Sequence, residues 1–284
     1  VRDHVDARRS GWIPALIPTA AGAWAHVDED GEWWRLWRFV EGARSIGASA
    51  DADVALAAGE AFGEFQELIA DLTDPPLVPT IPGFLELDRY LAALDAALAD
   101  HGADDAVDLV PFVDAHRWLE HRFPRGERPI HGDCKLNNLL FDAASTVVVA
   151  VLDLDTVMPG HWAWDFGDLA RSLMMGGGDE AEIFAVVARS FVAAAGIEAT
   201  VEELVQAPIH VAFMLGVRFL TDHLKGDGYF RVGFRGQNLD RAREQFHLVS
   251  RLEGRLDALE ASAERALGAR RRNITKAFKT KGER

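Results

Sequence analysis

Near the middle of the chain, residues 130 to 138 read Ile130-His131-Gly132-Asp133-Cys134-Lys135-Leu136-Asn137-Asn138. One predicted hairpin later, an apolar run that starts at Val147 ends in Leu152-Asp153-Leu154-Asp155. Phosphoryl transfer from a nucleotide needs a carboxylate that orients the attacking hydroxyl, oxygen ligands for magnesium, and a cation that offsets charge on the moving phosphoryl group. Asp133 can supply the first, Asn138 and Asp153 the second, and Lys135 the third. The spacing therefore indicates a phosphoryl-transfer site.

Three neighbouring residues have more than one interpretation. Asp155 is either a second carboxylate ligand of the metal or a hydrogen-bond acceptor for the loop amides of residues 156–160. Lys135 is either a solvated lysine or the cation beside the transferred phosphate, and the absence of any lysine before it favours the second role. Cys134 beside His131 suggests a nucleophile, but a thiolate needs an activating base, and the adjacent polar residues already have roles.

The composition is that of a globular protein, with 49% hydrophobic and 26% charged residues in 284 positions. That length allows one large domain or two smaller ones. We find no apolar run of the length that crosses a bilayer and no signal peptide, so the sequence predicts no membrane partner. Cys134 is the lone cysteine, which excludes an internal disulfide and is typical of a cytoplasmic protein.

Charge is distributed unevenly along the chain. The net charge is -15, while residues 265–284 contain eight Lys or Arg and one Glu, a net of +7, so the first 264 residues carry -22. Such an acidic body is a poor binder of nucleic acid, but it can hold a polyphosphate whose charge is screened by magnesium. We expect the basic end to be a solvated helix and tail.

A β-hairpin is predicted before the central stretch. Residues 23–27 and 32–40 flank a turn rich in Asp and Gly. The second strand contains Trp33, Trp34 and Trp37, and we expect these rings to pack against the core because buried aromatic side chains remove a large apolar area from water.

Apolar residues at helical spacing predict seven helices. Asp53 is the expected N-cap of the first, and four prolines between Pro75 and Pro82 predict an extended loop after it. Asp165 and Asp168 are expected to open a later helix, with Asp168 and Arg171 forming a surface ion pair. The helices are expected over residues 53–72, 88–98, 105–121, 164–174, 180–195, 201–224 and 239–267. Strands early and helices late predict a two-lobed α+β protein.

Four motifs together resemble one group of kinases. His-Gly-Asp-x-Lys-x-x-Asn at 131–138, followed by Leu-Asp-x-Asp at 152–155, resembles the aminoglycoside phosphotransferase and choline kinase branch of the protein-kinase-like fold. Within that branch, the chain is similar to the N-acetylhexosamine 1-kinases. This likeness is carried by residues 131–142, 152–160, 165–171 and 218–230. The resemblance implies a protein-kinase-like fold with a large helical lobe.

The resemblance also implies a reaction and a role for each matching residue. The implied reaction is ATP- and Mg2+-dependent transfer of a phosphoryl group to the anomeric 1-hydroxyl of an N-acetylhexosamine such as GlcNAc or GalNAc. The implied roles are catalysis by Asp133, beside the Lys135 cation inferred above, and metal binding by Asn138 and Asp153, with Asp155 close to the metal or the sugar. The backbone of Arg38, Phe39 and Val40 would bind adenine, and Arg218 and Tyr229, with Asp222 as a further candidate, would bind the sugar. His131 and Asp165 would brace the loop.

The start of the chain departs from the family's pattern. Kinases of this shape clamp the nucleotide phosphates with a Gly-rich loop and a strand lysine. Here no Gly-rich loop precedes Trp12, and no lysine precedes Lys135. We therefore expect residues 1–40 to be the remnant of an incomplete nucleotide-binding small lobe with its hinge, and residues 41–284 to form the catalytic and substrate-binding lobe.

Three other functions fit part of the pattern. A kinase of another small alcohol, such as an aminoglycoside, choline or a different sugar, shares the central motif. A catalytically silent kinase-like sugar-binding module would explain the missing phosphate clamp. A metal-dependent phosphohydrolase built on His131, Asp133, Asp153 and His161 would leave Lys135 and Asn138 without a role.

Overall fold

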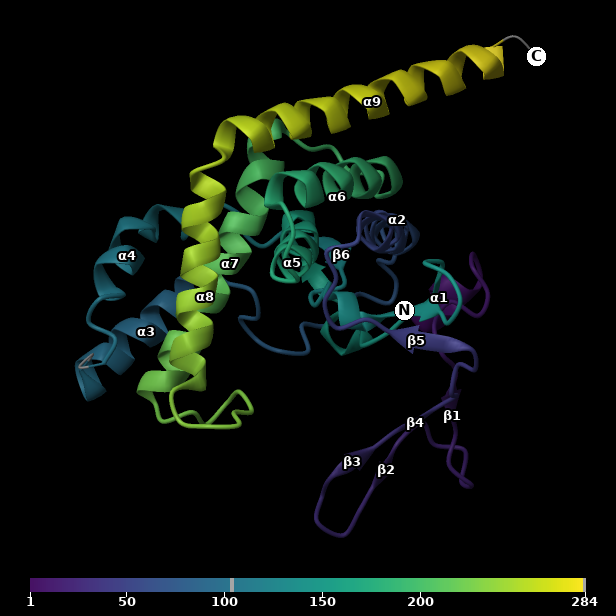
Figure 1. Ribbon diagram of the computed structural model, residues 1–284. Helices are drawn as coiled ribbons and strands as arrows, with labels where there is room; N and C mark the ends of the chain where they lie inside the picture. Colours follow the sequence, from purple (N-terminus) through teal and green to yellow (C-terminus); the bar gives the residue numbers. More distant parts are fainter. Residues whose placement is uncertain (103–104, 283–284) are drawn as a thin grey trace.

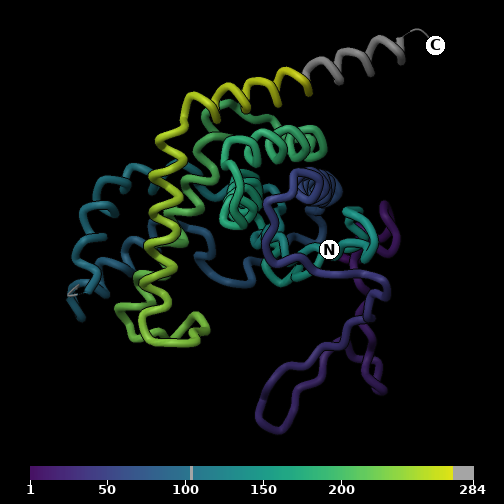
Figure 2. Tube along the Cα trace, in the orientation of Figure 1, coloured from purple at the N-terminus to yellow at the C-terminus, as the bar shows by residue number. Residues whose placement is uncertain are grey.

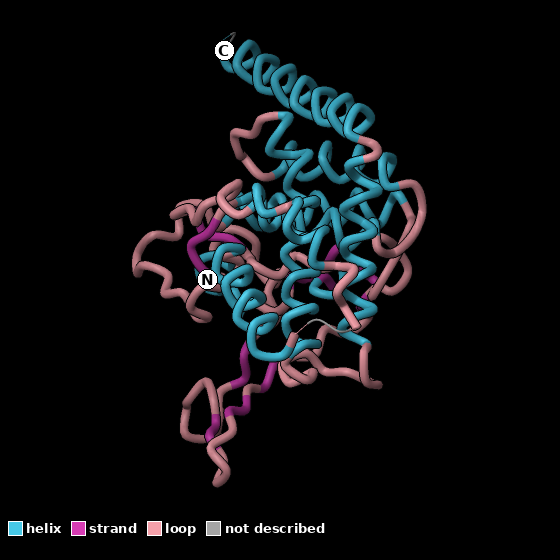
Figure 3. The backbone as a smooth tube through the Cα atoms, turned by 90° about the vertical axis from the view of Figure 1, so that its left-hand side faces the viewer, coloured by secondary structure: helices cyan, strands magenta, loops and turns pink. Residues whose placement is uncertain are grey.

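The computed structural model describes residues 1–102 and 105–282, with side chains described as far as residue 270. It confirms the α+β class, because helices make up most of the body and the strands are short (Figures 1 and 3). The predicted basic tail falls largely on residues 271–284, whose side chains lie outside the described part.

The N-terminal region is a short helix followed by a hairpin that extends away from the body (Figure 1). Strand β2 pairs with β3 in antiparallel register, which confirms the predicted hairpin, and β1 pairs with β4. The elements here are α1 (Arg2–Asp6), β1 (Leu16–Ile17), β2 (His26–Val27), β3 (Trp33–Trp34), β4 (Leu36–Trp37) and β5 (Ala43–Ser45).

The expectation that the hairpin tryptophans pack on the core is wrong. Trp33 is 75% exposed, Trp34 is 61% exposed, and Phe39 beyond them is 82% exposed. Each of these strands is two residues long and has one partner, and no element in the described part of the chain covers the rings. Apolar residues in a strand predict a face that would be stabilised by burial, but they do not show that a helix or second sheet packs against that face.

Two small sheets frame the central stretch. Strands β5, β7 and β8 form an antiparallel sheet in which Leu139 pairs with Val151. Strands β6 and β9 form a second antiparallel pair, which the sequence did not predict. The bounds are β6 (Arg128–Ile130), the 3-10 turn η2 (Leu136–Asn138), β7 (Leu139–Asp142), β8 (Val148–Val151), the 3-10 turn η3 (Leu154–Thr156) and β9 (Met158–Gly160). The loops after β6 and β8 therefore meet between the two sheets.

The helices form the rest of the body, with α5 packed against α2, α6 and α7. Helix α2 approaches α6 closely at Gly63, where an added Cβ would lie 2.8 Å from the Phe191 carbonyl oxygen. The bounds are α2 (Ala52–Leu68), α3 (Leu87–His101), α4 (Val110–Ala115), the 3-10 turn η1 (Arg117–Leu119), α5 (Trp162–Met174), α6 (Glu180–Ala194), α7 (Val201–Leu224), α8 (Gln237–Glu253) and α9 (Leu256–Gly282).

Helix boundaries differ from the predictions at four places. Helix α2 is capped by Asp51, whose side chain accepts from the Asp53 N–H, and α5 is capped by His161. The predicted helix over 105–121 is replaced by α4 and η1. The predicted helix over 239–267 breaks near Gly254 into α8 and α9, which then diverge (Figure 2). Helix α7 has the predicted bounds, and Thr200 and Glu203 form a capping box at its start.

Helix α7 also corrects the expectation about membrane-length segments. Among the described residues, α7 is the one helix that is both long enough and apolar enough to cross a bilayer. Of its most apolar 18-residue segment, 72% is buried inside the protein. Its apolar surface is covered by α3, α5 and α8.

Candidate active site

The loop between β6 and β7 carries the predicted catalytic residues. The Asp133 carboxylate lies 2.8 Å from the Lys135 Nζ and accepts a hydrogen bond of 2.8 Å from the Asn138 Nδ2. Asn138 Nδ2 also donates to the Asp133 backbone carbonyl at 2.8 Å. The Asp133 side chain is 21% exposed, so it can reach a ligand. The structure thus brings these three predicted residues into direct contact.

Asp165 on α5 accepts hydrogen bonds from the backbone of this loop. It is fully buried, and its carboxylate accepts from the N–H groups of His131 and Gly132, both at 2.7 Å, and from the Gln66 Nε2 at 2.6 Å. Burial raises the pKa of Asp165, because desolvation outweighs the donors that favour the charged form. Gly132 has φ +82°, and an added Cβ would lie 2.7 Å from the Thr156 carbonyl oxygen, so a larger residue does not fit.

His131 connects the catalytic loop to the segment that carries Asp153. Its Nε2 donates to the Leu152 carbonyl at 2.9 Å, and its Nδ1 accepts from the Asp133 N–H at 3.3 Å. A neutral ring with its proton on Nε2 satisfies both contacts. Two rings of α2 pack edge-on against the buried imidazole, those of Phe62 and Phe65. The His131 side chain therefore links the two loops directly.

Asp153 lies at the end of β8 and lines a cavity of about 430 Å³ together with the predicted hinge, Arg38, Phe39 and Val40. Its backbone is left-handed, with φ 58° and ψ 60°. The residue before it, Leu152, donates its N–H to the Asn138 carbonyl at 2.9 Å, so the segments that carry Asp153 and Asn138 lie side by side. The remaining lining is mostly apolar and comes from Ile13, Pro14, Trp37, Ala43, Leu140, Val151, Leu152 and Leu154. An apolar cavity with a carboxylate on its wall fits a nucleoside whose phosphates lie near Asp153.

The donor set at Asn138 and Asp153 fits magnesium, which binds hard oxygens and keeps several ligands as water and substrate phosphate. No group of three or more His, Cys, Asp or Glu side chains in the described ranges could hold a metal by itself. These two residues could therefore hold the ion together with substrate oxygens.

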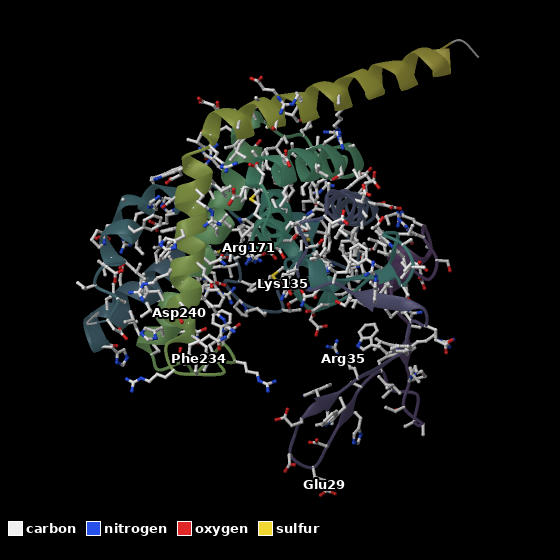
Figure 4. The ribbon with its side chains drawn as sticks, in the orientation of Figure 1. Glu29, Arg35, Lys135, Arg171, Phe234 and Asp240 are labelled. Atoms are coloured by element: carbon white, nitrogen blue, oxygen red, sulfur yellow. The ribbon has the colours of Figure 1, made fainter. Side chains whose placement is uncertain are left out.

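Asp155 is held by the hairpin. Its carboxylate accepts two hydrogen bonds from the Arg35 guanidinium, one of them at 2.8 Å between Nη1 and Oδ1. Arg35 is labelled on the hairpin in Figure 4. The guanidinium holds the pKa of Asp155 below its usual range. The Asp155 backbone carbonyl also accepts from the Thr80 hydroxyl at 2.7 Å. The structure thus pairs Asp155 with Arg35 instead of bringing it together with Asn138.

A second cavity, of about 590 Å³, is lined by Asp133. We call it the acceptor cavity. It brings Asp133 and Lys135 together with Arg218 and Tyr229, which the resemblance implied as sugar-binding residues. Its other polar lining residues were not assigned to a site from sequence: Thr156, Asp168, Arg171, Arg231, Arg241 and Gln245. Lys135 and Arg171 are both labelled at the centre of the body in Figure 4.

Arg218 lies among aromatic rings, whereas Asp222 accepts hydrogen bonds from a loop backbone. The Arg218 Cζ lies between 4.9 and 5.8 Å from four ring centroids, those of Phe84, Tyr90, Tyr229 and Phe230. Asp222 lines an adjoining cavity of about 380 Å³. Its carboxylate accepts from the N–H groups of Tyr229 and Phe230 at 2.8 and 2.9 Å, so it fastens the loop that carries Tyr229.

The structure also tests two expectations about side chains near the catalytic loop, the Asp168–Arg171 ion pair and Cys134 as a nucleophile. The Asp168–Arg171 pair forms, at 2.7 Å, but its side chains are only 13% and 10% exposed, so it is a partly buried pair and not a surface one. Cys134 is fully buried, and burial raises the pKa of its thiol well above the ordinary value. The thiol is therefore a poor nucleophile.

Arg241 and Gln245 carry a signal that the sequence interpretation missed. They lie one turn apart on α8, and Gln245 is a polar residue on a face otherwise occupied by buried apolar side chains such as Ala242, Phe246 and Val249. A polar side chain on the apolar face of an amphipathic helix needs a partner.

The fold, the cavity lined by Asp153 and the cavity lined by Asp133 define the class, a phosphotransferase of kinase-like architecture. The chain belongs to the phosphotransferase enzyme family, whose family model matches residues 6–199. The fold is similar to that of an aminoglycoside phosphotransferase from Alicyclobacillus acidocaldarius, with 14% identity, a TM-score of 0.62, and coverage of 93% of this chain and 81% of that chain. It is also similar to a choline/ethanolamine kinase family protein from Mesorhizobium loti, with 17% identity, a TM-score of 0.58, and coverage of 91% and 80%. These likenesses confirm the kinase-like fold.

Proposed function

We propose that this protein transfers the γ-phosphoryl group of ATP to the anomeric 1-hydroxyl of an N-acetylhexosamine such as GlcNAc or GalNAc. The observation that carries the choice of acceptor is the charge of the acceptor cavity. Its lining includes five cationic side chains and two carboxylates: Lys135, Arg171, Arg218, Arg231 and Arg241 against Asp133 and Asp168. Such a cavity disfavours choline, ethanolamine and the polycationic aminoglycosides, because like charges repel in a partly desolvated site. A neutral sugar rich in hydroxyl and carbonyl acceptors suits the guanidinium donors.

The proposed chemistry assigns one task to each residue of the loop. Asp133 orients the sugar hydroxyl and accepts its proton, and the anomeric hydroxyl is acidic enough for a carboxylate of modest basicity. Lys135, paired with Asp133 at 2.8 Å, supplies the positive charge beside the transferred group. Asn138 and Asp153 would hold the magnesium ion, which when bound offsets the charge of the phosphates. Asp155 could join them only if Arg35 released it.

The proposed nucleotide site is the cavity that joins the hinge to Asp153. The hinge backbone would meet adenine, and the apolar walls would exclude water from its faces. His131 and Asp165 would keep Asp133 and Asp153 in a fixed relation, since one buried frame holds both loops.

A phosphate-transfer screen tests the proposal. We expect ATP- and Mg2+-dependent transfer to GlcNAc or GalNAc and little transfer to choline or kanamycin. The Asp133→Asn variant should lose about 100- to 10,000-fold in kcat, which is the usual contribution of a general base. Asp240→Asn on the exposed side of α8 is the matched control and should keep wild-type turnover (Figure 4). Transfer to choline or kanamycin but to neither hexosamine would contradict the acceptor assignment, and full turnover in a folded Asp133→Asn variant would contradict the base.

A further inference from the structure

The acceptor cavity contains a buried carbonyl oxygen without a partner. Gln245 lies in the middle of α8 and is 4% exposed. Its Oε1 is buried and accepts no hydrogen bond from the residues that the structure describes. An unpaired buried acceptor costs about 1–3 kcal/mol, so folded proteins rarely keep one without a reason. Gln245 lines the acceptor cavity, so a turn of its side-chain amide would present this oxygen to a donor on the ligand.

A donor lies beside Gln245 on the same helix. Arg241 is four residues earlier, which places both side chains on one face of α8. Its Nη1 donates to the Asn238 Oδ1 at 2.9 Å and to the Arg231 carbonyl at 3.2 Å, and its Cζ lies 5.6 Å from the Phe219 ring centroid. These contacts fix the guanidinium, and the structure gives its Nε and Nη2 no partner within the described ranges. Arg241 also lines the acceptor cavity.

The same cavity also has an apolar wall. Val211, Met214 and Leu215 all line it from α7, and their spacing of three and four residues puts them on one helix face. Helix α7 packs directly on α8. An acceptor oxygen, a fixed cationic donor and an apolar wall therefore occur together between these two helices.

We propose that Gln245 is the residue that selects an acetamido group on the acceptor, its Oε1 accepting the amide N–H. An acetamido group has one N–H donor, one carbonyl acceptor and one methyl group. Gln245, Arg241 and the apolar wall of α7 match these three parts in turn. A hydroxyl in the same position would satisfy Gln245 but leave the Arg241 donors and the apolar wall without a partner. This inference rests on the proposed function, and it adds the group that the cavity recognises.

The test compares two sugars and three proteins. GlcNAc and 2-deoxyglucose differ in the acetamido group, and their binding is measured by calorimetry and their phosphorylation by kcat/KM. The proteins are the wild type, Gln245→Met, and Gln206→Met as a matched control. Gln206 lies on α7, its Oε1 is also buried without a partner among the described residues, and it does not line the acceptor cavity.

We expect Gln245→Met to reduce the preference for GlcNAc over 2-deoxyglucose by about tenfold, mainly through KM, because a ligand N–H loses its acceptor. Gln206→Met should keep the preference. The melting temperature of Gln245→Met should be equal to or above that of the wild type, since the substitution removes an unpaired buried polar group. A second measurement needs no variant. The wild type should bind 2-O-acetylglucose, which replaces the N–H by oxygen, about tenfold more weakly than GlcNAc.

The outcomes separate this inference from the proposed function. Transfer to GlcNAc with the preference unchanged in Gln245→Met, or equal binding of 2-O-acetylglucose and GlcNAc, would overturn the role of Gln245 and leave the phosphotransfer proposal intact. Preferential binding of GlcNAc that Gln245→Met abolishes, without phosphate transfer, would support Gln245 and refute the transfer. A wild type that binds neither sugar would overturn both.

Discussion

The substitution Asp165→Asn should lower the free energy of unfolding by about 2–4 kcal/mol. One oxygen of Asp165 accepts from the His131 N–H and the Gln66 Nε2, and the other accepts from the Gly132 N–H. An asparagine keeps one of these oxygens and turns an amide donor toward the remaining N–H. A buried donor without an acceptor costs about 1–3 kcal/mol, and each bond that loses its charged acceptor about 1 kcal/mol more. Removing a fully buried charge offsets part of this loss.

Urea unfolding followed by circular dichroism at pH 7 measures the change. Asp53→Asn, an exposed position near the start of α2, is the control and should shift the unfolding free energy by less than about 0.5 kcal/mol. The kcat of folded Asp165→Asn should also fall, because the His131–Gly132 backbone that positions Asp133 loses an anchor. If the destabilisation of Asp165→Asn is below about 1 kcal/mol, the reasoning that this carboxylate holds the loop is refuted.

Two further predictions concern the carboxylates after β8. Asp153→Ala should abolish magnesium-dependent transfer, and a magnesium titration that shows retained turnover would reject its role as a ligand. Arg35→Gln should raise the pKa of Asp155, measurable by NMR titration of the side-chain carboxyl, because it removes the charged hydrogen-bond donor that lowers this pKa. Because Arg35 depresses the folded-state pKa, the pair's small contribution to stability is present above the ordinary aspartate pKa and is lost as the pH falls through the depressed value. An Asp155 pKa unchanged by the substitution would mean that the pair does not form in solution.

The sequence predicted the structure correctly where a short local pattern determines it. The residues from His131 to Asn138 predicted a loop in which Asp133, Lys135 and Asn138 come together, and the structure has this loop. The apolar spacing of 201–224 predicted α7, because a capping box and a long apolar face leave few alternatives. The kinase-like fold followed from motifs that occur together in such proteins.

Other features depend on contacts that no local pattern encodes. Arg35 meets Asp155 across 120 positions of the chain, and nothing near either residue indicates the partner. The exposure of Trp33 depends on the absence of a covering layer in the described chain. Gln245 interrupts an apolar helix face in the sequence, but its place on the wall of the acceptor cavity follows only from the packing of the helices.

The exposed tryptophans of the hairpin give the protein an intrinsic fluorescence signal. Trp24, Trp33 and Trp34 are 57%, 75% and 61% exposed, whereas Trp12 and Trp164 are 3% and 2% exposed. Indole emission is red-shifted in water and is quenched by dissolved iodide, so the two groups of tryptophans fluoresce as separable populations. Trp118 on η1 is also 54% exposed, so in a Trp118→Phe variant a change in the red component on addition of a nucleotide would report on the hairpin region, without an attached dye.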